Sequence, residues 1–150
     1  MAEKASGTVV ARYTTKDFAG GHGFSAFDLD EDGNVVALSG RQPRCYYVCV
    51  TVRNIHGSSK RTLTRRAMDG SVAIAGGRIA YVGQRKLRAT RIVLTRLNGR
   101  VVRRLGRFGR ERQPLRELAL REDRIAWAVL RSDGDAVPGA PGRIRSAKLP

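Results

Sequence analysis

The sequence has 150 residues, 41% hydrophobic and 28% charged, which fits one domain and is too apolar for a wholly disordered chain. It contains no run of about 18 apolar residues, so we expect no membrane-spanning helix, and its opening residues lack the apolar core of a secretory signal peptide. The chain carries 29 Lys and Arg against 13 Asp and Glu, a formal net charge of +16.

The charge is unevenly distributed along the chain. Residues 1–60 hold seven basic and six acidic side chains, whereas residues 61–150 hold 22 basic and seven acidic ones. Such asymmetry is compatible with a polyanionic partner, because basic side chains that neutralise phosphates release condensed counterions. The competing interpretation is a GC-rich genome, whose codons enrich Arg, Ala and Gly together.

Short β-branched and apolar stretches separated by turn signals predict strands throughout, and no helical periodicity is sustained. The dipeptides Asp32-Gly33, Gly76-Gly77 and Asn98-Gly99 predict hairpin turns. In chain order the expected strands are 7–13, 24–29, 34–38, 45–52, 61–65, 72–75, 78–82, 90–97, 101–105, 115–120, 124–128 and 143–149.

Several of these strands recur at an interval of about 46 residues. Arg78-Ile79-Ala80-Tyr81-Val82 returns as Arg124-Ile125-Ala126-Trp127-Ala128, with a weaker copy at 34–38. Residues 7–13 match residues 99–105, two intervals away. With the strands of one unit labelled A to D, the chain reads D, ABCD, ABCD, ABC, and four strands per unit of this length are typical of a propeller blade.

Over roughly residues 7–149 the sequence therefore resembles the TolB-like and WD-repeat-like class of β-propellers, through segments 27–38 and 77–82. The resemblance implies an all-β fold of four-stranded antiparallel blades, with residues 1–150 forming one partial propeller. Its parts are a closing strand at 7–13 and blades at 24–67, 71–108 and 115–149.

Three blades are too few to close a propeller, since natural ones have about four to eight. One solution is half of a six-bladed single-chain propeller. The other is a two-chain ring in which residues 7–13 complete the third blade of a partner copy. The first is favoured because two-chain propellers are unusual.

Asp28, Asp30 and Asp32 precede Gly33 at alternate positions, a pattern that can direct oxygens at one Ca²⁺. The carboxylate that an EF-hand requires at position 12 is replaced by Ser39. The competing interpretation is a polar hairpin turn. Calcium is the one cofactor that the sequence proposes.

A second candidate site is polyanion binding in the basic half of the chain. Strand alternation over 101–105 places Arg100 and Arg104 on one face and Arg103 on the other, which splits the cluster. Loop residues are expected to gather instead, namely Arg85, Lys86, Arg88, Arg107, Arg110 and Arg112.

Cys45 and Cys49 lie four residues apart in a predicted strand, about 13 Å at 3.3 Å per residue, so they are expected to be two buried thiols that do not pair. Tyr81 and Trp127 are expected in the core between blades rather than in a ligand pocket. No G-x-S-x-G, H-E-x-x-H or Walker A pattern is present, and the sequence gives no support for an enzyme.

We therefore expect a non-enzymatic scaffold or binding module that recognises a protein partner, or a second copy in a closed ring, through the loops between strands. The alternative is a basic nucleic-acid-binding protein that uses the arginines of residues 61–150. The compartment is not indicated by any segment of this chain.

Overall fold

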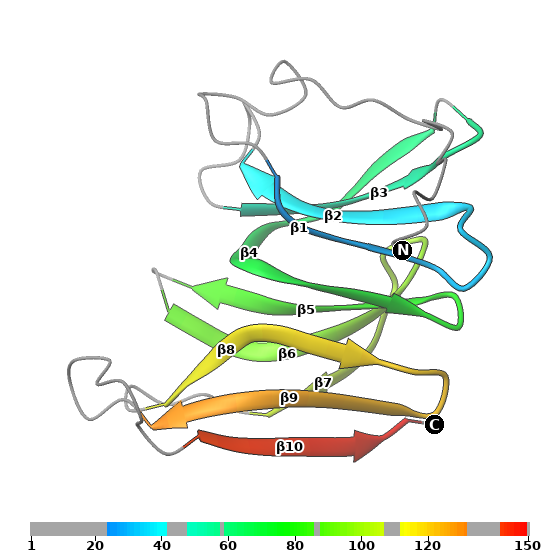
Figure 1. The fold of residues 1–150 in the computed structure, drawn as a ribbon. Helices are drawn as coiled ribbons and strands as arrows, with labels where there is room; N and C mark the ends of the chain where they lie inside the picture. Colours follow the sequence, from blue (N-terminus) through cyan, green and yellow to red (C-terminus); the bar gives the residue numbers. More distant parts are fainter. Residues whose placement is uncertain are drawn as a thin grey trace, which may run out of the picture.

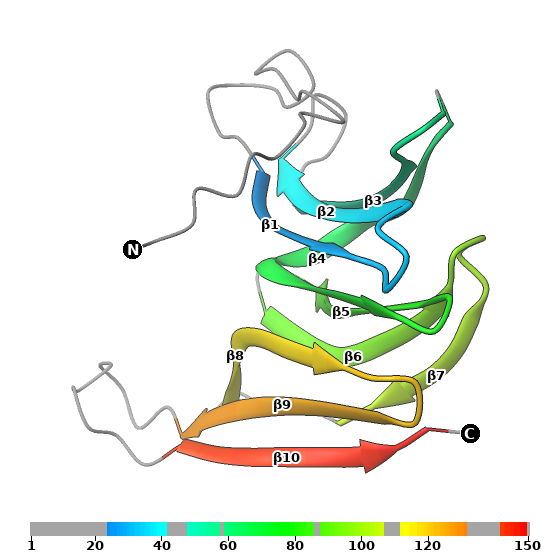
Figure 2. The same cartoon turned by 45° about the vertical axis from the view of Figure 1, so that its right-hand side comes forward.

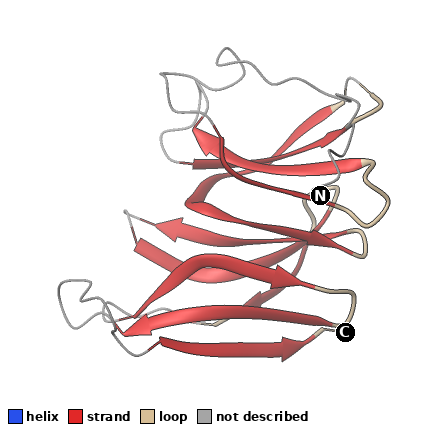
Figure 3. Ribbon diagram, viewed as in Figure 1, coloured by secondary structure: helices blue, strands red, loops and turns tan. Residues whose placement is uncertain are grey.

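The computed structural model describes residues 24–41, 48–57, 59–85, 88–106, 112–131 and 142–149, and their secondary structure consists of β-strands (Figure 3). The prediction of an all-β chain is confirmed. No helix among these residues is long and apolar enough to cross a membrane. The strands are β1 (Phe24–Leu29), β2 (Val35–Arg41), β3 (Val48–Asn54), β4 (Lys60–Ala75), β5 (Arg78–Arg85), β6 (Arg88–Arg96), β7 (Val101–Leu105), β8 (Arg112–Leu120), β9 (Arg124–Arg131) and β10 (Gly142–Lys148).

The strands form two antiparallel sheets. Strands β1 to β7 pair in chain order into a seven-stranded sheet that curls strongly, and β10, β9 and β8 pair into a three-stranded sheet beside it (Figure 1, Figure 2). Gly33, Gly76, Gly77 and Gly99 have φ angles of 69°, 54°, 66° and 85°, a region that favours glycine. The three predicted hairpin turns are therefore confirmed.

The central strand β4 contradicts the predicted division into blades. The sequence placed strands 61–65 and 72–75 in different blades, but one 16-residue strand runs through both. It pairs with β3 up to Ala67 and with β5 from Ala67 onward, and the register of the second pairing shifts between Ala67 and Val72. The predicted first and second blades thus belong to one continuous sheet, and separate four-stranded blades are not confirmed.

Ser71 shows why the chain bends here rather than breaking into two strands. Its buried hydroxyl donates to the carbonyl oxygen of Met68 at 3.0 Å and accepts the Val82 N–H at 3.2 Å. A bulge leaves backbone groups without ladder partners, and a side chain that supplies them lets the strand continue. A lone serine inside a strand pattern gave no sequence signal for this role.

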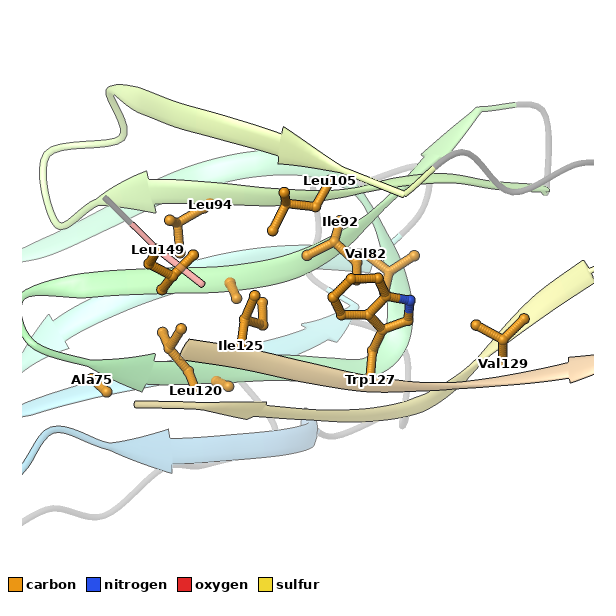
Figure 4. Close-up of a cluster of buried hydrophobic side chains, with 12 residues drawn as sticks. Ala75, Val82, Ile92, Leu94, Leu105, Leu120, Ile125, Trp127, Val129 and Leu149 are labelled. Carbon is orange, nitrogen blue, oxygen red and sulfur yellow. The ribbon is translucent and has the colours of Figure 1, made fainter. Parts of the chain in front are cut away.

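Two apolar clusters hold the molecule together. One lies within the curl, between β2–β3 and β4–β5, and includes Val50, Ile74, Ile79 and Tyr81. The other joins the two sheets and consists of Ala73, Ala75, Ala80, Val82, Ile92, Leu94, Leu105, Leu120, Ile125, Trp127, Val129 and Leu149 (Figure 4). The prediction that Tyr81 and Trp127 belong to the core is confirmed, since both are less than 9% exposed.

Cys49 corrects a second prediction. It is fully buried on β3 and disulfide-bonded, and no described residue is a free cysteine. The expectation of a buried thiol assumed a continuous strand over positions 45–52, whereas β3 begins at Val48. The other cysteine of the sequence, Cys45, and the proposed closing strand 7–13 lie outside the described residues.

Candidate polyanion-binding surface

Six exposed basic side chains lie on strands of both sheets. We call this set the basic band. Two of its members lie at the start of β4, three lie on or just before β7, and one lies at the end of β10. They are Lys60, Arg61, Arg100, Arg103, Arg104 and Lys148.

The middle of the band exists because β7 is the last strand of its sheet. Alternation turns Arg103 toward the three-stranded sheet and Arg104 toward the inside of the curl, and the sequence predicted that the two lie on opposite faces of the strand. An edge strand exposes both of its faces, so the four residues before the buried Leu105 are exposed alike. Arg103 and Arg104 thus point to opposite sides of β7, and both are exposed.

Hydrogen bonds from arginine side chains to main-chain carbonyl groups join the three parts of the band. The Arg61 Nη1 donates to the carbonyl oxygen of Asn98 in the β6–β7 turn at 3.2 Å. The Arg103 Nη1 donates to the carbonyl oxygen of Lys148 at 3.1 Å. Both guanidiniums are thus positioned by carbonyl groups, and their positive charge is not offset at those contacts.

The described carboxylates lie at the turns of the β1–β2 and β8–β9 hairpins, and the second of these turns adjoins Lys148, which is in register with Arg124. Glu31 accepts the Gly76 N–H with both oxygens at 3.1 Å. The Arg78 Nη1 donates to the carbonyl oxygen of Glu122 at 3.3 Å. Acidic side chains therefore lie at these two hairpin turns, and Lys148 is the member of the basic band that lies beside one of them.

The predicted calcium ligands lie in this turn region. Asp28 accepts the Leu29 N–H with Oδ1 at 3.0 Å and the Ile74 N–H with Oδ2 at 2.9 Å. Asp30 accepts the Val35 N–H at 2.9 Å, and Asp32 is exposed. No three His, Cys, Asp or Glu residues in the described part are grouped to hold a metal ion. Two of these carboxylates have structural hydrogen bonds, and calcium binding stays a prediction.

The predicted cluster of basic loop residues is described only in part. Arg85 is exposed at the end of β5 and pairs in register with Arg88 across the β5–β6 turn. Arg112 begins β8, opposite Arg131. Lys86, Arg107 and Arg110 lie outside the described residues. Sequence reasoning missed Lys60, Arg61 and Lys148, because their proximity to β7 comes from contacts between distant strands.

Tyr81 lies behind the band, in one cross-strand row with Val93 and Arg104. Burial raises the pKa of the Tyr81 hydroxyl above its usual value of about 10, although a hydrogen bond to Thr64 and the charge of Arg104 act in the opposite direction. The Tyr81 phenol is therefore neutral near pH 7, and it lies in the same cross-strand row as Arg104.

This pKa shift predicts a loss of stability at alkaline pH. Above about pH 10 the unfolded chain releases the Tyr81 proton while the folded chain keeps it, so the free energy of unfolding falls as pH rises. Tyr81→Phe should cost about 1 kcal/mol near neutral pH, through the lost hydrogen bond, and that difference should shrink above pH 10. Urea titrations of both proteins across this range measure it. A difference that stays constant or grows would contradict the shift.

The fold and the surface together define an all-β protein of two antiparallel sheets with exposed basic side chains on β4, β7 and β10. Neither the models of known protein families nor the curated proteins yield a match to this chain. One solved structure with a similar fold is that of a protein described as a conserved lipoprotein from Clostridium novyi, with a TM-score of 0.61. The two chains are 8% identical over 85% of this chain and 88% of the other.

At this identity the similarity concerns the fold alone. It does not support the resemblance to TolB-like and WD-repeat-like propellers, and that assignment is wrong: the chain forms one curled sheet of seven strands where the resemblance required separate blades. The motifs that carried it, segments 27–38 and 77–82, are hairpins that many antiparallel folds use.

Proposed function

We propose that the protein is a non-enzymatic binding module that holds a polyanionic partner on the basic band. The observation that supports it is the presence of six exposed cations on β4, β7 and β10, with Arg61 hydrogen-bonded to the turn before β7 and Arg103 to the end of β10.

The shape of the band favours a partner with many charges over a small anion. Arg100 to Arg104 alone extend about 13 Å along β7, at 3.3 Å per residue, and the band continues onto neighbouring strands on both sides. Guanidinium groups present a planar fork that fits phosphate oxygens, and the four arginines of the band fix more geometry than lysines would.

Nucleic acid is the partner that this chemistry fits best, through its phosphate backbone. Binding of exposed single strands depends on stacking of bases on aromatic side chains, and the band consists of Arg and Lys. Phe27, the large aromatic residue exposed in the described part, lies on β1 and outside the band. Contact with phosphates of a duplex, without base recognition, follows from this composition.

The loops that the sequence analysis assigned to partner recognition lie largely outside the described residues, at 86–87, 107–111 and 132–141. Our proposal therefore uses the strands, whose side chains are placed. The proposal keeps the expected binding module. Its ligand is a polyanion, as in the nucleic-acid-binding alternative that the sequence left open.

A salt titration of binding to a DNA duplex of about 20 base pairs tests the proposal. Six phosphate contacts predict a loss of affinity on the order of 10³-fold between about 50 and 200 mM salt. Scrambling the duplex sequence should leave the affinity unchanged, because phosphates carry no sequence information. Absence of binding at 50 mM salt, or an affinity that does not change with salt concentration, would show that the band does not hold polyanions.

A further inference from the structure

The three-stranded sheet ends at β10, and the outer edge of this strand has no strand partner among the described residues (Figure 1, Figure 2). All seven residues of β10 pair with β9 without a register shift, so the strand is regular along its whole length. A regular edge strand presents a row of main-chain donors and acceptors on which a further strand can add.

The other edge strands of the two sheets are irregular. Register shifts interrupt the pairing of β1 with β2 and that of β7 with β6. Strand β8 contains Pro114, and its pairing with β9 shifts after that residue. Bulges and prolines are features that keep further strands from adding at an edge, and β10 has neither. Among the described edges, β10 is therefore the one best suited to accept a strand.

A hydrogen bond at the end of β10 shows which of its main-chain groups face outward. The Leu149 N–H donates to the carbonyl oxygen of Asp123 at 2.7 Å, in continuation of the register between β10 and β9. In an antiparallel pair, alternate residues turn both their N–H and C=O groups to the partner, so the odd-numbered residues of β10 bond to β9. The N–H and C=O groups of Ile144 and Ser146 therefore point to the open edge.

Arg103 marks the end of the open edge. Its Nη1 donates to the carbonyl oxygen of Lys148 at 3.1 Å, so this outward-facing acceptor is already occupied. The part of β10 that can accept a strand is therefore residues 142–146, which we call the β10 edge. It stops before Lys148 and includes no member of the basic band.

Two kinds of side chain flank the β10 edge. Ile144 is 83% exposed, on the face of the sheet that points away from the core. Arg145 is exposed on the opposite face, in register with Trp127. A strand that adds here alternates in the same way, so it meets an aliphatic side chain on one face and a guanidinium on the other. This arrangement favours a partner that alternates apolar and acidic residues.

The charge of β10 disfavours a second copy of the same strand as the partner. Antiparallel pairing of two copies about Ile144 places Arg145 opposite Arg143, and pairing about Arg145 places the two Arg145 residues opposite each other. Like charges directly opposite each other destabilise a strand pair, whereas opposite charges stabilise it. A strand that carries a carboxylate at this position fits where a second β10 does not.

We propose that the β10 edge binds an extended acidic peptide of another protein, which adds to the three-stranded sheet as a fourth, antiparallel strand. Main-chain hydrogen bonds to Ile144 and Ser146 hold the peptide, and a carboxylate opposite Arg145 gives it specificity. All described strand pairs are antiparallel, and the added strand continues that pattern. The inference is independent of polyanion binding, because the β10 edge and the basic band share no residue.

Fluorescence anisotropy of the full chain with a labelled heptapeptide that alternates valine and glutamate tests the proposal. With a glutamate opposite Arg145, the valines lie opposite Ile144 and Ser146 and turn their N–H groups to β10. N-methylation of the valines should therefore weaken binding by at least about tenfold, through lost hydrogen bonds and a steric clash. N-methylation of the glutamates is the matched control, and the affinity should stay within about twofold, since those N–H groups face away. Both peptides carry the same charge.

A charge reversal tests the role of Arg145. Arg145→Glu should weaken binding of the valine–glutamate peptide about tenfold, and it should bind a valine–lysine peptide in its place. Arg85→Glu makes the same change of charge at an exposed residue of the other sheet. This control should bind the valine–glutamate peptide like the wild type.

Hydrogen exchange followed by NMR locates the peptide. Saturating peptide should slow exchange of the Ile144 and Ser146 N–H groups by at least about tenfold and leave that of Arg145, which faces β9, unchanged. Equal affinity of the two methylated peptides, or no binding up to about 1 mM peptide, would overturn the proposal. Protection of the Ile144 and Ser146 N–H groups without peptide, together with a doubled mass in sedimentation, would also overturn it, because a second copy would then occupy the edge.

Discussion

The triple variant Arg100→Gln, Arg103→Gln, Arg104→Gln should bind duplex DNA about 10³-fold more weakly than the wild type near 50 mM salt. Each lost phosphate contact removes about 0.9 from the slope of log affinity against log salt, so three contacts remove about 2.7. By the same calculation, the triple variant should still bind about 10²-fold more weakly than the wild type near 200 mM salt. These residues form the centre of the basic band, on and beside edge strand β7.

The control is a second triple variant with the same loss of charge, Arg85→Gln, Lys86→Gln, Arg88→Gln, in the loop cluster that the sequence favoured. In this control, the slope of log affinity against log salt concentration should stay close to that of the wild type. Fluorescence anisotropy with a labelled duplex measures both variants, and thermal unfolding checks that losing the Arg103 contact to β10 has not opened the fold. If the control loses affinity and the β7 variant does not, the binding surface lies at the β5–β6 turn and the band is not the site.

Trp127→Ala should lower the free energy of unfolding by about 3–5 kcal/mol, the usual cost of removing a large buried aromatic side chain. Trp127 is 7% exposed in the cluster that joins the two sheets, with its indole ring directed at Val82 and Ile92 (Figure 4). Its Nε1 is buried without a hydrogen-bond partner, and an unpaired buried donor costs about 1–3 kcal/mol. Trp127→Phe removes that donor and keeps a ring, so it should cost less than half as much as alanine.

Urea unfolding followed by far-UV circular dichroism suits this comparison, because the chain has one tryptophan and both variants lose its fluorescence. Ile144→Ala, at an exposed position of the same sheet, should change stability by less than about 0.5 kcal/mol. Equal losses for Trp127→Phe and Trp127→Ala would mean that the indole nitrogen has a stabilising partner.

Local structure could be predicted from this sequence because it depends on neighbouring residues. Alternating apolar residues and the turn at Asn98-Gly99 located β7 to the residue, and the β5 and β9 strands were found at Arg78 and Arg124. These signals report whether one stretch pairs with the next, and antiparallel hairpins are made of such pairs.

The arrangement of the strands could not be predicted in the same way. Whether 61–65 and 72–75 belong to one strand depends on how Ser71 satisfies the backbone at the bend of β4, a contact with Met68 and Val82 that no spacing reveals. The basic band was missed for the same reason. Arg61 is 37 residues from Asn98, and Arg103 is 45 from Lys148, and only the folded chain brings them together.

The carboxylates of the first hairpin have a consequence for how the molecule avoids misassembly. Beyond Ala67, β4 pairs with β5 on one side, and Asp28 and Glu31 accept the N–H groups of Ile74 and Gly76 on the other. Open N–H groups on a strand edge are a template on which strands of other molecules add and aggregate. By occupying these two donors with side chains, the first hairpin leaves an incoming strand fewer groups to pair with, which disfavours the addition of a strand at this edge.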